Sequence, residues 1–210
     1  MSAFTFSAPI VSEEEEKAER AALTEEERQQ LYDELFGTEK EIPETDEMRA
    51  TGTSLMRDAI ESMPLEEKSA YMTACERVPE LVQSESPCIR FLRATKWNAW
   101  SAAKRLADYW KVRVKIFGEK AFMSMTLDGA MEDEVEYLEK AICMSLPPDA
   151  HGRPVVLVDR VRCIKEIAPR EHAARCIWYI IQTISEVEKA QKLGYVILAN
   201  YRVGTCNVFT

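Results

Sequence analysis

Two residues that could bind a metal ion or perform thiol chemistry, His172 and Cys176, lie four positions apart. In a helix this spacing puts both side chains on one face, and Cys163 upstream could supply a third ligand. A zinc site would need a fourth ligand or a second close pair, and the sequence offers neither. Cysteine–histidine catalysis would need a third group that orients the histidine, and no such partner is recognisable. We therefore expect a structural or surface role for these residues, with no metal.

The glycines of the chain do not form a phosphate-binding pattern, and its carboxylates do not form a pair suited to acid–base catalysis. The chain has only seven glycines, and it contains neither the G-x-x-x-x-G-K-[ST] pattern nor the G-x-G-x-x-G pattern that holds phosphate groups. Neighbouring carboxylates are abundant only in a solvated acidic run, whereas a general acid and a general base need different environments. The glycines and carboxylates therefore argue against a nucleotide enzyme and against acid–base catalysis by the acidic run, and we expect no cofactor.

The acidity of the chain, with a formal net charge of −9, is concentrated at its start. Residues 1–50 carry 15 Asp and Glu against 5 Lys and Arg, which predicts a solvated charge run or an exposed helix. Within it, Thr24 and Glu27 form a capping box that starts a short helix ending at Gly37. The six cysteines lack a C-x-x-C pair, no secretory signal precedes the acids, and no apolar run is long enough for a bilayer. These features predict a cytoplasmic protein.

Residues 88–120 combine nine Lys and Arg, two Asp and Glu and three tryptophans, which makes nucleic acid a serious rival partner. A nucleic-acid groove needs aromatic side chains exposed beside the basic groups, so that bases can stack on them. Trp100 and Trp110 instead fall on the apolar stripe of a helix, so we expect both to be buried and expect no nucleic-acid partner. Basic residues off that stripe could dock the protein transiently on an anionic membrane surface, each contributing about 1 kcal/mol. They are Lys104, Arg105, Lys111 and Lys115.

These basic and aromatic residues must be positioned by helices, and proline, asparagine and glycine mark where the helices begin and end. Pro64 and Pro79 separate apolar helical stripes, and Ser86-Pro87 starts a brief further helix. Asn98 can cap a longer helix, which Gly118 ends from the C′ position. The pattern predicts a bundle of short helices that closes with a helical hairpin.

The pattern changes to β-strands after residue 135. The runs YLEKAICMSLP (137–147) and PVVLVDRV (154–161) are rich in strand formers and flank the turn sequence PDAHGR, which predicts two paired strands. A long helix is expected from Pro169 to Gly194, followed by a third strand in YVILANY. Strand, helix and strand in this order predict an α/β fold in which one helix crosses the sheet.

The order of these parts resembles the CRAL-TRIO (Sec14-like) lipid-binding family. The run IRFLRATKWNAWSAAKRLADYWKVR (89–113) is similar to the Phe-Leu-Arg-Ala segment and amphipathic helix of that family's N-terminal helical domain. HGRPVVLVDR (151–160) is similar to its first core strands, and the long helix and third strand follow in the same order. The likeness covers about residues 85–204, where Asn200 and Gly204 are approximate counterparts of an Asp and a Gly in the family pattern.

The resemblance implies a helical bundle followed by part of an α/β lipid-binding domain. Its parts would be an acidic region over 1–50, a helical domain over 51–125 and a partial lipid-binding domain over 126–210. It implies a protein that is not an enzyme and that binds a phospholipid or phosphoinositide in an apolar cavity and transfers it between membranes. Since the family's domain continues with further strands and a gating helix, we expect this cavity to be incomplete. The expected walls are apolar residues of the strands and the long helix. They are Val156, Val158, Ile177, Ile181, Ile184, Val196 and Leu198.

Two alternatives stay open. The wall residues could be ordinary core, since apolar strand residues are usually covered by protein on both faces. The chain could also be a remodelled relative that holds no lipid and acts as a protein-interaction module. A sheet edge left open near VGTCNVFT (203–210) would then favour self-association.

Overall fold

The computed structural model describes residues 12–36, 43–163 and 167–200. It contains two compact units, Met1–Lys40 and Glu41–Thr210. Every candidate site residue belongs to the second unit, so the first is described only briefly.

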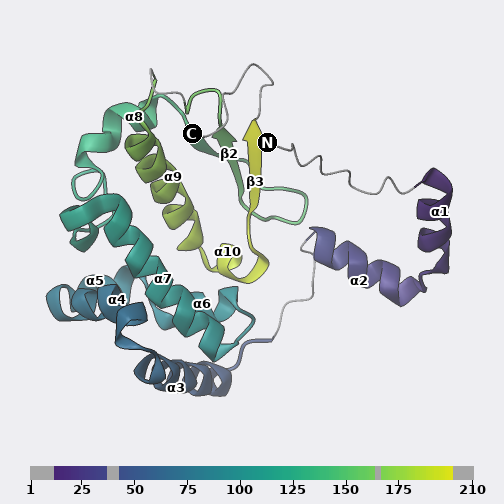
Figure 1. Cartoon of the computed structure of the whole chain (residues 1–210), viewed down its shortest axis with the longest axis horizontal. Coiled ribbons are helices and arrows are strands. Elements are labelled where there is room, and N and C mark those ends of the chain that lie inside the picture. The colour runs from purple at the N-terminus through teal and green to yellow at the C-terminus, as the bar shows by residue number, and fades with distance from the viewer. Residues whose placement is uncertain (1–11, 37–42, 164–166, 201–210) are drawn as a thin grey trace, which may run out of the picture. The chain divides into compact units, whose positions relative to one another are not determined.

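The first unit contains two helices, α1 (Glu13–Ala22) and α2 (Glu25–Phe36) (Figure 1). The backbone N–H of Thr24 donates to the Glu27 carboxylate, and Thr24 Oγ1 accepts a hydrogen bond from the Glu27 N–H. The predicted capping box is therefore confirmed. The predicted end of α2 at Gly37 lies outside the described residues.

The second unit begins with five helices joined by short turns. They are α3 (Asp46–Ser62), α4 (Leu65–Arg77), α5 (Pro79–Glu85), α6 (Cys88–Ala94) and α7 (Ala99–Phe117). The predicted breaks at Pro64 and Pro79 are confirmed, and the domain boundary expected after residue 50 falls inside α3. Asn98 Oδ1 accepts a hydrogen bond from the N–H of Ser101 at 2.9 Å, which caps α7 as predicted. Gly118 ends α7 with a φ of +57°, a conformation that favours glycine.

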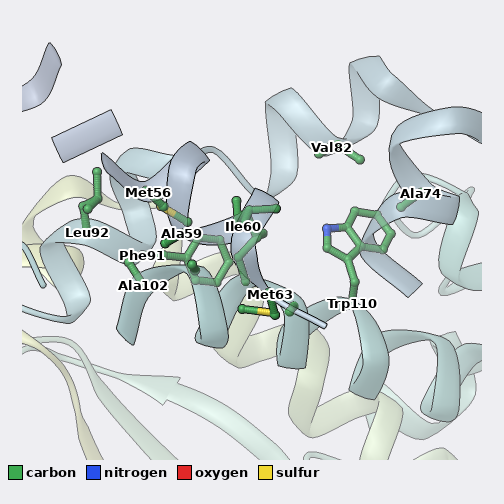
Figure 2. Close-up of a cluster of buried hydrophobic side chains, with 13 residues drawn as sticks. Met56, Ala59, Ile60, Met63, Ala74, Val82, Phe91, Leu92, Ala102 and Trp110 are labelled. Carbon is green, nitrogen blue, oxygen red and sulfur yellow. The ribbon is translucent and has the colours of Figure 1, made fainter. Parts of the chain in front are cut away.

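A hydrophobic cluster holds these helices together, and Trp110 of α7 lies within it (Figure 2). Figure 2 shows the indole near Val82 of α5 and Ala74 of α4. Trp110 is fully buried, as predicted, and its indole N–H donates to Ser86 Oγ at 3.0 Å. The prediction for Trp100 is wrong, because 53% of that side chain is exposed. Trp97, which precedes α7, packs against the cluster instead.

The rest of the second unit is a small mixed sheet with helices beside it. Its elements are α8 (Val135–Glu139), β1 (Cys143–Leu146), β2 (Val155–Asp159), α9 (Arg170–Ser185), α10 (Glu188–Leu193) and β3 (Val196–Asn200). The strand order is β1-β2-β3, with β1 antiparallel and β3 parallel to β2, and α9 and α10 make the crossover between the parallel strands (Figure 1). A mostly helical chain with this sheet is consistent with the predicted α/β class.

The bounds of one predicted strand and one predicted helix differ from the structure. Residues 137–139, expected to begin the first strand, belong to α8, where the ring of Tyr137 stacks on His172 of α9 at 4.1 Å between ring centroids. The expected single helix from 169 to 194 divides, because Val187 is extended between α9 and α10. In both places packing between elements distant in sequence decides the local structure.

The strand register determines which side chains share a face of the sheet, because side chains alternate along a strand. Cys143 pairs with Val158, and both pack with Ile184 of α9. The opposite face ends in the polar pair of Asp159 and Asn200, and its other paired positions are all apolar. They are Met144, Leu146, Val155, Leu157, Val196 and Leu198. None of these six belongs to the hydrophobic clusters of the described residues.

Among the described helices, none is long and apolar enough to cross a membrane.

Candidate functional site

A pocket of about 350 Å³ lies where α6 and α7 meet α9 and α10. Figure 1 shows α7 running beside both α6 and α9, and α10 beside α6. Most of the pocket lining is apolar, with a few polar groups among it. The lining residues are Arg90, Phe91, Ala94, Arg105, Tyr109, Trp178, Ile181, Gln182, Ser185, Ala190, Gln191 and Tyr195. A pocket of this size with few polar groups is typical of a small-molecule site.

A buried amide organises the polar part of this pocket. Gln182 of α9 is 2% exposed, and its Oε1 accepts hydrogen bonds from Arg90 Nη2 at 3.1 Å and from the Tyr109 hydroxyl at 3.2 Å. Its Nε2 donates to the Glu85 carbonyl oxygen at 3.2 Å. The Tyr109 hydroxyl in turn accepts from Arg113 Nη1 at 2.8 Å, and burial raises the pKa of Tyr109. The network joins the helical part to α9 and fixes the positions of the donors.

Aromatic side chains form much of the apolar wall. The ring centroid of Trp178 lies 5.3 Å from that of Tyr109, and Tyr109 packs edge to face on Phe91 at 5.7 Å. The indole N–H of Trp178 is buried and has no acceptor among the described residues. An unsatisfied buried donor costs about 1–3 kcal/mol, so this group is unusual in a well-packed protein.

Most of the predicted cavity walls are core in this structure. Val156, Val158 and Ile184 are buried in one cluster, against which Ile177 packs. These four side chains therefore pack between the sheet and α9, and none of them lines the pocket at α6, α7, α9 and α10. The physical reason is that successive side chains of a strand point to opposite faces of the sheet, and Val156 and Val158 lie on the face toward α9.

The other three predicted wall residues lie at two different places. Ile181 lines the pocket beside Gln182, on the side of α9 toward the helical part. Val196 and Leu198 lie on the opposite face of the sheet, where 46% of Leu198 is exposed. The structure thus does not bring the seven predicted residues into one site.

The predicted basic face is exposed on α7, but it is not uniformly positive. Lys104, Lys111 and Lys115 share one side of the helix, with the exposed Asp108 between them. Lys104 Nζ lies 3.9 Å from a Glu67 carboxylate oxygen. Arg105 also lines the pocket, and its Nη1 donates to the Ala94 carbonyl oxygen at 3.3 Å.

The residues first considered for metal or thiol chemistry have other partners. His172 Nδ1 lies 2.7 Å from one oxygen of Glu134, which is 1% exposed, and Arg175 Nη1 lies 2.8 Å from the other. Glu134 is thus the orienting partner that the sequence did not reveal. Burial raises the pKa of Cys176 to about 12, which disfavours the thiolate. Within 12–36, 43–163 and 167–200, no group of His, Cys, Asp and Glu could hold a metal ion.

The sequence reasoning missed Arg90, Tyr109, Trp178 and Gln182 as site residues. One usable signal was present. Arg90 and Gln182 are polar residues inside otherwise apolar helical runs, CIRFL and IWYIIQTI, and such residues are rarely buried without a partner. Their mutual contact joins positions 92 residues apart, which no local pattern contains.

Comparison with family models, with curated proteins and with solved structures finds no match for this chain.

Proposed function

We propose that this chain binds a hydrophobic ligand without performing chemistry on it, as the resemblance to the CRAL-TRIO family implies. The pocket between α6, α7, α9 and α10 carries this proposal, because its walls are mainly apolar and its polar groups converge on one buried amide, Gln182. Apolar walls supply affinity, and a few fixed polar groups supply orientation. The ligand class is lipid, and the pocket is a different place from the sheet interface that the sequence favoured.

The first experiment is to purify the whole chain, extract it with organic solvent and identify bound lipid by mass spectrometry. We expect a lipid near one equivalent per chain. Ala94 is exposed at the pocket, so Ala94→Trp should obstruct the site without disturbing the core and should lower the bound lipid. Ala50→Trp, at an exposed helical position outside the lining, is the matched control. Equal lipid in both variants, or none in the unaltered folded chain, would contradict the proposal.

Transfer between membranes would require contact with a membrane surface, and the exposed lysines of α7 are the proposed contact. Reversing two charges, with Lys104→Glu and Lys111→Glu, should weaken sedimentation with anionic liposomes, because each basic group near such a surface contributes about 1 kcal/mol. Liposomes without anionic lipid are the control and should show little binding by either protein. Unchanged binding to anionic liposomes would remove α7 as the docking face.

A second candidate function, protein interaction without lipid, is favoured by the apolar sheet face. Leu198, on this face of β3, is 46% exposed, and no described strand pairs with the outer edge of β3. Open edges promote pairing between chains, so the partner proposed for this face is a second copy of this chain. Sedimentation velocity over a concentration series would show a dimer that Leu198→Lys disperses. A monomer at all concentrations would exclude this candidate.

A further inference from the structure

Several arginines of the second unit bind buried or largely buried carboxylates. Three such pairs are Arg93 with Glu44 at 2.8 Å, Arg113 with Glu85 at 2.5 Å and Arg175 with Glu134 at 2.8 Å. Arg90 differs from them. It is only 9% exposed, and no carboxylate among the described residues lies within ion-pair distance of its guanidinium group. A buried cation without a counterion is costly, so its position in a pocket wall suggests a ligand of opposite charge.

The carboxylates nearest to Arg90 already have other partners. Glu85 binds Arg113 with one oxygen, and its other oxygen accepts from the N–H of Met125 at 2.7 Å. A carboxylate oxygen of Glu186 accepts from Gln182 Nε2 at 3.2 Å. None of the residues that line the pocket is acidic, whereas Arg90 and Arg105 are both basic. The pocket therefore attracts anions.

The guanidinium group of Arg90 keeps donors for such an anion. Two of its five N–H groups donate within the described residues, one to the Glu85 carbonyl oxygen at 2.8 Å and one to Gln182. Burial lowers the pKa of Arg90, and the more distant carboxylates of Glu186 and Glu85 oppose that shift only in part. The orphaned indole N–H of Trp178 is a further donor in a residue of the same wall. Arginine binds carboxylate and phosphate groups with two parallel hydrogen bonds.

The apolar wall and the size of the pocket limit the rest of the ligand. Phe91, Trp178 and Ile181 offer surface for a hydrocarbon chain. The volume of about 350 Å³ lies at the low end of the roughly 300–1,000 Å³ of small-molecule sites, which favours one chain over two. We propose that the pocket binds a single-chain anionic amphiphile, with its carboxylate or phosphate group at Arg90 and its chain along Phe91, Trp178 and Ile181. This assignment rests on the proposed function and names its ligand class.

Calorimetric titration of the full-length chain with three probes tests the assignment. Decanoate carries a chain and an anion, decanol carries the chain alone, and acetate carries the anion alone. We expect decanoate to bind about tenfold more tightly than decanol, the factor that about 1.4 kcal/mol produces, and acetate to bind weakly. Arg90→Met should remove this preference, since it keeps the apolar stem and loses the charge. Arg57→Met, at an exposed position of α3, is the control and should retain it.

The outcomes separate the ligand class from the proposed function. Equal affinities for decanoate and decanol in the unaltered chain would overturn the role of Arg90 and leave hydrophobic-ligand binding intact. Acetate binding as tightly as decanoate would identify a site for free anions and overturn the assignment of an amphiphile. Failure of both decanoate and decanol to bind would overturn the proposed function as well. The comparison of probes uses the unaltered chain, so it stands even where Arg90→Met fails to fold.

Discussion

Replacing Glu85 by glutamine tests whether the buried ion pair with Arg113 holds the second unit together. Arg113 is fully buried, and the Glu85 side chain is 13% exposed. One Glu85 oxygen faces Arg113 Nη1 at 2.5 Å and the other accepts from Met125 N–H at 2.7 Å. A glutamine at this position has one side-chain acceptor oxygen in place of two. Its NH₂ group would face either the Arg113 guanidinium group or the Met125 N–H, which are both donors. The guanidinium group also loses its counter-charge.

The expected cost of Glu85→Gln follows from this geometry. Removing one partner of a buried ion pair costs about 3–5 kcal/mol. Arg113 retains three neutral acceptors, the carbonyl oxygens of Ala121 and Met123 and the Tyr109 hydroxyl, so we expect about 3 kcal/mol. Urea unfolding followed by tryptophan fluorescence and by far-UV circular dichroism measures this loss, and coincident transitions justify a two-state treatment.

An exposed ion pair of similar length supplies the control. Arg77 Nη2 lies 2.7 Å from Glu119, but these side chains are 46% and 83% exposed. Solvent screens such a pair, so Glu119→Gln should change the unfolding free energy little. In an Arg113→Met background, Glu85→Gln should cost much less than in the unaltered chain, because the buried cation is gone. A cost below about 1 kcal/mol for Glu85→Gln alone would refute the argument from burial.

Two further substitutions test other contacts of the second unit. A hydrogen bond from Arg93 lowers the pKa of Glu44 below its ordinary value. The stability that this carboxylate adds is therefore fully present above the unfolded pKa of about 4.3, and it is lost as the pH falls through the lower folded pKa. The difference in unfolding free energy between the unaltered chain and Glu44→Gln should therefore be full at neutral pH and shrink in acid, and a pH-independent difference would contradict the linkage. Ser86→Ala leaves the Trp110 indole N–H without an acceptor and should cost about 1–3 kcal/mol in urea unfolding, whereas the exposed Ser84→Ala should cost far less.

Helix starts and stops could be predicted from the sequence with good success. Asn98 caps α7, Gly118 ends it, and Pro64 and Pro79 separate the helices before it. These signals act within one turn of helix, so the residues that decide the structure are neighbours in the chain. The pairing of β1 with β2 was also predictable, because the turn sequence between them joins two runs of strand formers.

The candidate site could not be predicted in the same way. A helical stripe marked Ile181 and a continuous apolar run marked Val156, yet Ile181 lines the pocket and Val156 is fully buried against α9. An apolar sequence pattern shows that a side chain points into the protein, but it does not show whether other side chains or a ligand fill the space there. Trp100 shows the same limit, because its position on the helical stripe did not ensure a neighbour to cover it.

The sequence by itself determined most of the order of helices and strands, the acidic first region and the α/β class, because caps, prolines and hydrophobic periods operate over a few residues. Only the tertiary structure brought Arg90 of α6 to Gln182 of α9, and Glu134 to His172. Hydrogen bonds and burial between such residues depend on how whole helices dock. That docking follows from the packing of many side chains at once, and no local pattern encodes it.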